Sequence, residues 1–274
     1  MKKIIWLCSV ISVMVSVLML VGCSSSKGNN NPNLVRVGTI AGPETKLMEV
    51  AKQVALKKFG LDVHIVAFSS YTMPNQALED GAIDANAFQH KPYLLSQVKM
   101  HGYTFAIAGK TFLYPMGLYS KSVAKLADLK PGAEIAIPND PSNEARALLL
   151  LQGAGLIQLK PGVGINATIR DVTVNPKKFK LISLDAAQIP RALDDVALAA
   201  INTNYAIPFG LSPAKNALYA ENTDSPYVNL IVVRSKDKNQ KKIKELVEAF
   251  QSQAVVDEAK KLFGDGAVPG FQVS

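Results

Sequence analysis

A buried strand, a proline and an amphipathic helix follow one another twice in this chain of 274 residues. The first cycle is the apolar segment LVRVGTI (34–40), with Pro43 at a helix start and Gly60 at its end. The second is GAEIAIPND (132–140), followed by Pro141 and an apolar helix. Such cycles predict α/β lobes, and the chain is long enough for two of them. We therefore expect two α/β lobes with a ligand cleft beyond the carboxyl ends of their strands.

Further strands and helices are predicted from the spacing of apolar and turn residues. The expected strands cover 61–68, 82–88, 103–113, 115–120, 179–184, 196–202 and 227–235. The expected helices begin near Pro74 and Pro92 and cover 142–156, 186–195 and 239–253. The last helix carries Ile243, Leu246, Val247 and Phe250 at the spacing of one apolar face.

The first 22 residues have the pattern of a secretory signal. Two lysines precede an apolar run from Ile4 to Val21, and the tetrapeptide LVGC ends at Cys23. This tetrapeptide resembles the lipobox of bacterial lipoproteins, in which the cysteine is acylated. We predict a signal peptide at 1–22, then lipidated Cys23 and a flexible tether at 23–33, anchored to a bilayer by acyl chains such as palmitate. An uncleaved signal anchor is the alternative, because an apolar run of this length nearly spans a membrane.

Several function classes lack their signals in the sequence. The two cysteines are Cys8 and Cys23, so the chain after the leader has no thiol for a disulfide or a metal beyond the acylated one. His64, His90 and His101 lack the spacing of metal ligands, and no nucleotide-binding, zinc-hydrolase or serine-nucleophile motif occurs. We expect no metal and no cofactor, and the missing motifs make an enzyme less expected without excluding one. The formal charge of +8 is scattered among acidic residues, which indicates a solvated surface and no nucleic-acid partner.

Aromatic and polar side chains gather where the first strands end. Tyr71 follows the strand 61–68, and Phe88 and His90 end the next strand. With two-residue alternation, Asn86, Phe88 and His90 share one side of the strand. Because two of these three side chains are polar, they suit the wall of a cleft better than an apolar core. The alternative is that Phe88 belongs to the core and His90 lies at the surface or caps a helix.

The helix of the second cycle begins with residues suited to an anion. Asn139 or Asp140 is expected to cap it, and Asn143 and Arg146 lie on one face. A helix start favours negative charge, and a guanidinium offers two parallel donors to a carboxylate.

The polar residues at this helix start, and a third polar group after a later strand, could also have purely structural roles. Arg146 could pair with Glu144 or Asp194 at the surface. The third group ends the strand 196–202 and comprises Asn202, Asn204 and Tyr205. Asparagines also suit turns, so turn formation is the alternative for this group.

Four segments resemble one known family. They are DANAFQHKPYL (84–94), IPNDPSNEARALLLLQ (137–152), LDAAQIPRALDDVALAAINTNYA (184–206) and SPYVNLIVVR (225–234). Together with the lipobox, they resemble the methionine-binding lipoproteins of bacterial ABC importers, the NlpA-like substrate-binding proteins. The resemblance runs from about Leu34 to the end of the chain. Its clearest departure is Glu144, next to the expected site.

The resemblance implies a two-lobed periplasmic-binding-protein fold of the type II-like class, with the ligand in the interlobe cleft. By motif, Tyr71 and Phe88 are expected to sandwich the ligand side chain, and Tyr114 to line the same cleft.

The resemblance also implies which residues meet the charged end of the ligand. His90, Asn143 and Arg146 are expected near the α-carboxylate, with Arg146 in most direct contact. Asn202 and Tyr205 are expected to fix the amino group and backbone of the ligand.

The function that follows from the resemblance is capture of L-methionine, with D-methionine as an open variant, and delivery to an importer permease with its ATPase. We expect a monomer held at the periplasmic face of the inner membrane, with sorting to the outer membrane left open. Lobe 1 is expected at 34–114 and 228–274, and lobe 2 at 115–227. The rival interpretations are a site for a methionine-containing dipeptide or another small apolar amino acid, a surface lipoprotein without a transport role, and a secreted hydrolase.

Overall fold

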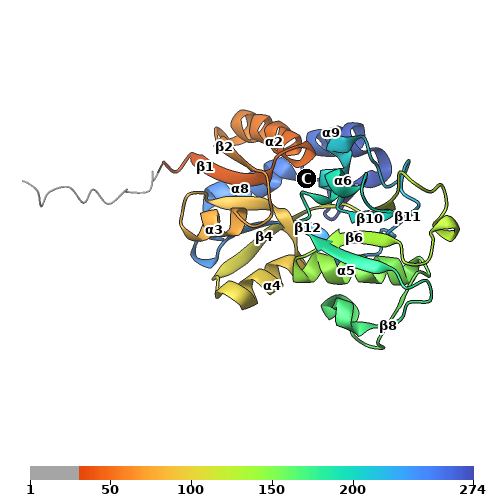
Figure 1. Ribbon diagram of the computed structural model, residues 1–274. Coiled ribbons are helices and arrows are strands. Elements are labelled where there is room, and N and C mark those ends of the chain that lie inside the picture. Colours follow the sequence, from red (N-terminus) through yellow and green to blue (C-terminus); the bar gives the residue numbers. More distant parts are fainter. Residues whose placement is uncertain (1–30) are drawn as a thin grey trace, which may run out of the picture. The chain divides into compact units, whose positions relative to one another are not determined.

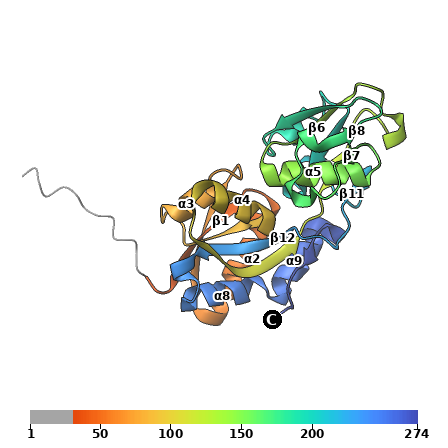
Figure 2. The same cartoon turned by 90° about the horizontal axis from the view of Figure 1, so that it is seen from below.

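The computed structural model describes residues 31–274 of the chain. The predicted signal peptide (1–22), Cys23 and most of the 23–33 tether lie outside the described residues. Residues 33–274 contain two main β-sheets, each covered by its own helices (Figures 1 and 2). The prediction of an α/β chain with two lobes is therefore confirmed.

The first lobe is built on a six-stranded mixed sheet. In spatial order its strands are β13 (Val268–Pro269), β4 (Phe105–Leu113), β12 (Val228–Arg234), β3 (Ala85–His90), β1 (Leu34–Ile40) and β2 (Asp62–Phe68). β1 runs parallel to β2 and β3, whereas β12 is antiparallel to β3 and β4. The carboxyl ends of β1, β2 and β3 thus meet at one edge, and the loops that follow them lie together.

The second lobe is built on a five-stranded sheet. In spatial order its strands are β11 (Tyr219–Ala220), β5 (Gly117–Tyr119), β10 (Leu198–Ile201), β6 (Glu134–Pro138) and β9 (Lys180–Leu184). β6 is parallel to β9 and β10, and β5 is antiparallel to its neighbours. A separate small ladder pairs β7 (Gln158–Leu159) with β8 (Val172–Val174).

Helices cover both sheets. Those of the first lobe are α2 (Pro43–Phe59), α3 (Pro74–Glu79), α4 (Lys91–His101), α8 (Lys241–Phe250) and α9 (Gln253–Phe263). Those of the second lobe are α5 (Pro141–Gly153), α6 (Ile189–Ala192) and α7 (Thr203–Ala206). Each lobe has its own apolar core, and a third cluster contains Ile40 and Phe88 of the first lobe with Tyr119 and Ile201 of the second. Apolar side chains therefore also join the two lobes.

The predicted capping residues bound α2 and start α5. α2 starts at Pro43 and ends at Gly60, whose φ of 66° is in the left-handed region that glycine tolerates. α5 is capped by Asp140, which accepts a hydrogen bond from the backbone N–H of Asn143. The helix expected over 186–195 was too long, because only Ile189–Ala192 is helical and turns flank it.

The chain passes between the sheets twice. It leaves the first sheet at the end of β4 (Leu113), enters β5 at Gly117, and returns between β11 (Ala220) and β12 (Val228). The two crossing segments, 114–116 and 221–227, are therefore the covalent links between the lobes.

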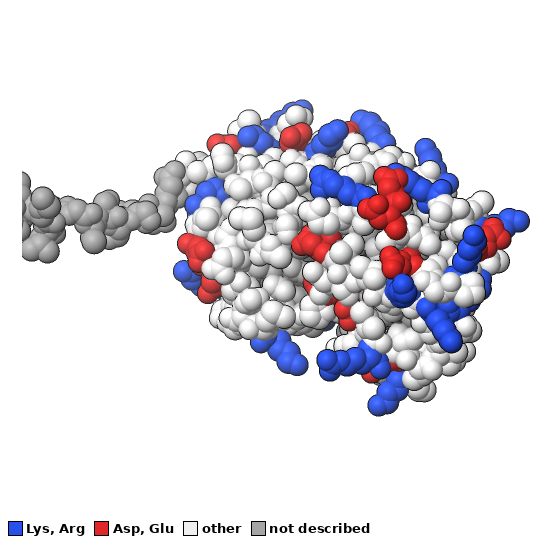
Figure 3. Space-filling view, in the orientation of Figure 1, with Lys and Arg blue, Asp and Glu red and all other residues white. Residues whose placement is uncertain are grey.

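The surface carries charges of both signs. On the face seen in Figure 3, Lys and Arg side chains are interspersed with Asp and Glu. This mixture agrees with the solvated surface expected from the sequence. Over residues 31–274, no helix is both long and apolar enough to cross a bilayer.

Candidate functional site

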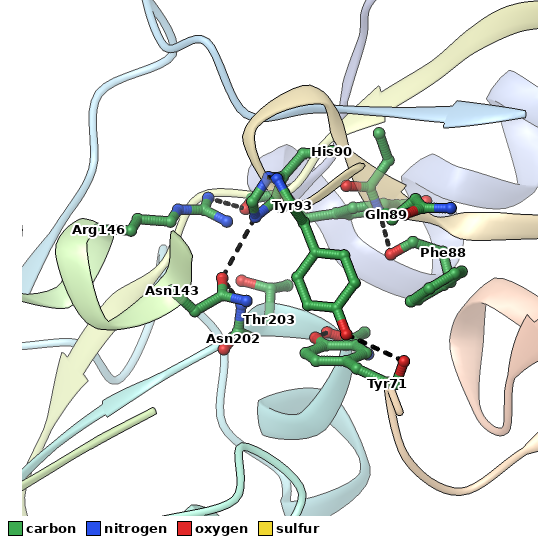
Figure 4. Close-up of a pocket in the computed structure, with 12 residues that line it drawn as sticks. Tyr71, Phe88, Gln89, His90, Tyr93, Asn143, Arg146, Asn202 and Thr203 are labelled. Atoms are coloured by element: carbon green, nitrogen blue, oxygen red, sulfur yellow. Dashed lines mark hydrogen bonds between the residues drawn. The ribbon is translucent and has the colours of Figure 1, made fainter. Parts of the chain in front are cut away.

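A pocket lies where the strand ends of the first lobe meet helix starts and crossing segments of the second. It encloses about 340 Å³ of space between atoms, part of it open to solvent. Its lining residues are Tyr71, Phe88, Gln89, His90, Tyr93, Tyr114, Asn143, Arg146, Asn202, Thr203, Asn204 and Asn229 (Figure 4). Seven of the eight predicted site residues are among them. The eighth, Tyr205, packs behind the lining, with its ring centroid 4.9 Å from that of Tyr71.

Aromatic rings form one side of the pocket. The Tyr71 ring centroid lies 5.9 Å from those of Phe88 and Tyr93, and Phe88 and Tyr93 meet edge to face at 5.7 Å. The Tyr93 hydroxyl donates to the backbone carbonyl of Tyr71 at 3.0 Å, which holds the Tyr93 ring in place. Phe88 is also part of the apolar cluster between the lobes, so its core role and its place in the pocket wall coexist.

His90 ends β3 and caps α4, and its ring links the two lobes. Its Nδ1 accepts from the backbone N–H of Tyr93 at 3.2 Å, so Nε2 carries the hydrogen and donates to Asn143 Oδ1, also at 3.2 Å. Burial, together with the nearby charge of Arg146, lowers the pKa of His90 to about 3. The imidazole is therefore neutral at physiological pH and acts as a fixed hydrogen-bonding group.

The start of α5 fixes the orientation of two amides. Asp140 accepts from Asn143 Nδ2 through both carboxylate oxygens, at 3.1 and 2.9 Å. Asn143 Oδ1 consequently faces the other way, where it accepts from Asn202 Nδ2 at 2.9 Å as well as from His90. Asn202 Oδ1 is buried and has no hydrogen-bond partner within residues 31–274. A carbonyl oxygen thus remains available to a ligand donor.

A second buried amide, that of Asn204, offers a hydrogen-bond donor to the pocket. Asn204 Oδ1 accepts from the Tyr71 hydroxyl at 2.7 Å, across the two lobes. Asn204 Nδ2 is buried and, in the described part of the chain, lacks a partner. The pocket therefore presents both an unpaired acceptor and an unpaired donor, which suits a small molecule carrying groups of both kinds.

Arg146 lies at the back of the pocket and already has an anionic partner. Its Nε donates to Glu221 Oε1 at 2.7 Å and its Nη2 to Glu221 Oε2 at 2.5 Å, while Nη2 also donates to the Tyr114 carbonyl at 2.9 Å. The guanidinium carbon is 4.3 Å from the ring centroid of Tyr227. The expected bidentate donation from Arg146 to a ligand carboxylate needs correction, because Glu221 occupies that edge and Nη1 is what remains.

The surface ion pairs considered for Arg146 do not form. Asp194 pairs with Lys121 at 2.7 Å, and Glu144 accepts from the backbone N–H of Ile169. Arg146 is only 3% exposed.

The expected alternation along β3 is also wrong. A bulge leaves Phe88 without a paired residue on β12, where Gln89 lies opposite Leu230 and Ala87 opposite Ile231. Asn86 is therefore not in the pocket, although Phe88 and His90 are.

Amide–amide hydrogen bonds lie beneath the bulge. Asn86 Nδ2 donates to Asn75 Oδ1 at 3.0 Å, and Gln89 Nε2 donates to Asn86 Oδ1 at 2.9 Å. All three side chains are buried, so they support the strand end that carries Phe88 and His90.

Sequence reasoning missed several lining residues: Gln89, Tyr93, Thr203, Asn204 as a ligand-facing group, and Asn229. Glu221, the partner of Arg146, was missed as well. The sequence held one signal for it. Arg146 was expected in a closed cleft, and a buried arginine usually needs an acidic partner. Among the side chains that the structure describes, no group of three or more His, Cys, Asp or Glu residues could hold a metal ion.

Comparison with known proteins decides the family. The family model described as NlpA lipoprotein matches residues 35–271. The chain belongs to the NlpA lipoprotein family. Among curated NlpA-type relatives, the D-methionine-binding lipoprotein MetQ of Yersinia pestis is 51% identical over 263 residues, covering 95% of this chain and 96% of MetQ. Outer membrane lipoprotein 3 of Mannheimia haemolytica is 45% identical over 243 residues, covering 89% and 92%.

Solved structures share the fold. A periplasmic substrate-binding protein of an ABC transporter from Coxiella burnetii has a TM-score of 0.84 and 62% identity, over 86% of this chain and 100% of that one. A nutrient-binding protein from Burkholderia cenocepacia, solved bound to methionine, has a TM-score of 0.85 and 52% identity, over 86% and 100%. The two-lobed substrate-binding fold is therefore shown.

Proposed function

We propose that this chain binds methionine in the pocket between its lobes and delivers it to an ABC importer. The observation that carries the proposal is the pairing of an aromatic wall with unpaired buried amide groups and Arg146 in one cavity. The names of the NlpA relatives, MetQ above all, support it. We take L-methionine as the primary ligand and include D-methionine, since the relatives are named for that enantiomer.

The chemistry of methionine matches the two sides of the pocket. Its flexible thioether suits the rings of Tyr71, Phe88 and Tyr93, because sulfur packs favourably against aromatic edges. Its carboxylate suits Arg146 Nη1 and the Asn204 amide N–H, and its ammonium suits the Asn202 carbonyl oxygen. His90 and Asn143 act mainly by holding Asn202 in place.

The energies are adequate for tight binding. Burying a methionine side chain contributes about 1.5–3 kcal/mol, and each hydrogen bond to a charged group contributes about 1.5–3 kcal/mol. Association itself costs about 4–15 kcal/mol, so the contacts on both lobes are needed together. We expect a micromolar or tighter complex, about −8 kcal/mol or beyond.

Delivery is proposed to use a membrane permease with its ATPase, as expected for this class of binding protein. Acylated Cys23 would hold a monomeric protein at the membrane, most simply at the periplasmic face of the inner membrane. The outer membrane is the alternative location, because one relative is named as an outer membrane lipoprotein. The protein itself performs no chemical step in this proposal.

Thermal denaturation with a ligand panel tests the proposal. The purified protein is first unfolded and refolded to remove carried-over ligand, then heated with each amino acid and with glycyl-methionine. A ligand at 100 times its Kd adds about 2.7 kcal/mol to the free energy of unfolding. We expect the largest stabilisation with methionine. If glycyl-methionine stabilises the protein more than methionine does, the dipeptide is the ligand. If none of the compounds stabilises it, a surface lipoprotein without a transport role is favoured.

A further inference from the structure

Glu44 is a buried carboxyl next to the pocket that does not line it. It lies in the first turn of α2, is only 6% exposed, and contributes no atom to the pocket wall. Its Oε1 accepts from Asn229 Nδ2 at 3.0 Å, and its Oε2 has no hydrogen-bond partner within residues 31–274. Burying a carboxyl with one oxygen unpaired costs free energy, and the bond from Asn229 offsets part of that cost.

That contact fixes the orientation of the Asn229 amide. Asn229 Nδ2 also donates to the backbone carbonyl of Phe88 at 3.1 Å. A backbone carbonyl can only accept, so the NH₂ end of the amide must face Phe88 and Glu44. Both N–H groups of the amide are then used. The Asn229 carbonyl oxygen is left as the group that this residue can offer to the pocket it lines.

We propose that Glu44 is a positioning residue that holds the Asn229 carbonyl oxygen toward the ammonium group of the bound amino acid. The proposal rests on the methionine site proposed above and deepens it, because it assigns selectivity for the amino group to a residue outside the pocket lining. Asn202 Oδ1, the unpaired acceptor described above, would share the same ammonium.

The charge state of Glu44 agrees with a positioning role. Burial raises the pKa of Glu44 to about 8, against the lowering effect of the Asn229 hydrogen bond. The carboxyl is therefore mostly neutral at pH 7 and does not attract the ammonium as an ion-pair partner. A neutral carboxyl still accepts from Asn229 through its carbonyl oxygen.

A ligand pair separates this role from a general effect on stability. L-methionine is compared with 4-(methylthio)butanoic acid, which has the same thioether and carboxylate but no amino group. The measured quantity is the ratio of the two Kd values for the full chain purified in detergent. A residue that merely supports the fold would weaken both ligands alike and leave the ratio unchanged.

Three substitutions define the expected result. Glu44→Leu and Glu44→Met remove the acceptor and should reduce the preference for methionine about tenfold, the value of one hydrogen bond to a charged group. Glu44→Gln keeps an acceptor oxygen and should stay within about threefold of the wild type. Glu49→Leu is the matched control, because it makes the same change on the exposed side of α2.

A double-mutant cycle identifies Asn229 as the intermediary. In an Asn229→Ala background, Glu44→Leu should have no further effect on the ratio. An unchanged ratio in both Glu44→Leu and Glu44→Met would overturn the proposal. So would a loss that persists in the Asn229→Ala background, because Glu44 would then act on the ligand by itself. If the wild type binds neither compound, the methionine site itself fails, which is a distinguishable result.

Discussion

At the scale of single residues, the pocket is defined by polar atoms with no remaining partner. Two of the amides that line it, Asn202 and Asn204, use one end for the protein and have no partner for the other end within residues 31–274. Asn143 anchors Asn202 through its carbonyl oxygen, and Tyr71 holds Asn204 through its hydroxyl. Because buried polar groups are normally paired, the unpaired ends of Asn202 and Asn204 indicate where a ligand completes the structure.

Phe88 provides a test of the thioether side of the pocket. Sulfur–aromatic contacts contribute about 0.3–1.5 kcal/mol beyond those of a methylene group. Phe88→Leu keeps an apolar wall but removes the ring, so it should reduce the preference for methionine over norleucine by about two- to tenfold. Calorimetric Kd values for both ligands measure the ratio. An unchanged ratio would mean that Phe88 serves the apolar cluster and not the sulfur.

His90 gives a pH dependence of defined sign. Its pKa is about 3 in the folded protein, against 6.5 for a histidine side chain exposed to water. As pH falls from 6.5 toward 3, the unfolded chain takes up a proton at His90 that the folded protein does not bind, so the free energy of unfolding decreases.

The matched variant for this test is His90→Gln, which cannot titrate. The wild type should lose a few kcal/mol more than the variant over that pH range. Urea denaturation of both proteins at several pH values measures the difference. Parallel curves for the two proteins would show that His90 titrates normally and is not held neutral.

At the scale of elements, α5 is attached to both crossing segments through one side chain. Arg146 donates to the carbonyl of Tyr114 in the first segment and to Glu221 in the second. Glu221 also accepts from the backbone N–H of Met116 at 3.0 Å. The face of α5 that lines the pocket is therefore tied to the residues that must bend if the lobes move. We propose lobe boundaries within these segments, consistent with 34–114 and 228–274 for one lobe and 115–227 for the other.

Removing Glu221 should expose the cost of an unpaired buried charge. Glu221→Ala leaves Arg146 buried without an anionic partner and should lower the free energy of unfolding by about 3–5 kcal/mol. Asp194→Ala is the control, because the Lys121–Asp194 pair is exposed and contributes about 1 kcal/mol or less. Chemical denaturation measures both. Equal small losses would show that the Arg146–Glu221 pair is not a buried charge pair.

The elements were predictable where the sequence pattern was local. The strand–proline–helix cycles, Gly60 as a helix end and the apolar face of α8 all follow from spacing within a few residues. Short strands without such a pattern were missed, including β11 and β13, and so was the helix α9. α9 has its own apolar face, but the preceding helix was extended over its first residue.

The sequence predicted which residues form the site, but not the hydrogen bonds and ion pairs that these residues make. Strand ends and helix starts in the sequence indicated Tyr71, Phe88, His90, Asn143 and Arg146, and the structure brings them together. The contacts that set their roles join residues far apart in the chain. Arg146 and Glu221 are 75 positions apart, which no local spacing reveals. The bulge at Phe88 depends on register with β12 and was equally hidden from two-residue alternation.

At the scale of the whole molecule, the two lobes are joined at the pocket by hydrogen bonds as well as by the chain. Tyr71 of the first lobe donates to Asn204 of the second, and His90 bonds to Asn143. These contacts describe a closed arrangement. A ligand that touches both sides would add to them and shift the population toward the closed form.

Lobe closure should be visible in solution scattering. After removal of carried-over ligand, the protein is expected to populate more open forms, and methionine should reduce its radius of gyration. Alanine at equal concentration is the control, because it lacks the side chain that fills the aromatic wall. Identical scattering curves with and without methionine would show that the lobes do not respond to the ligand.

The most direct test of the account is a calorimetric titration of L-methionine into the refolded protein. We predict one site per chain with a Kd of about 1 μM or lower, because both lobes contribute contacts to a single small zwitterion. An Arg146→Ala variant that still folds should bind at least tenfold more weakly. Absence of binding up to about 1 mM methionine in the wild type would contradict the account.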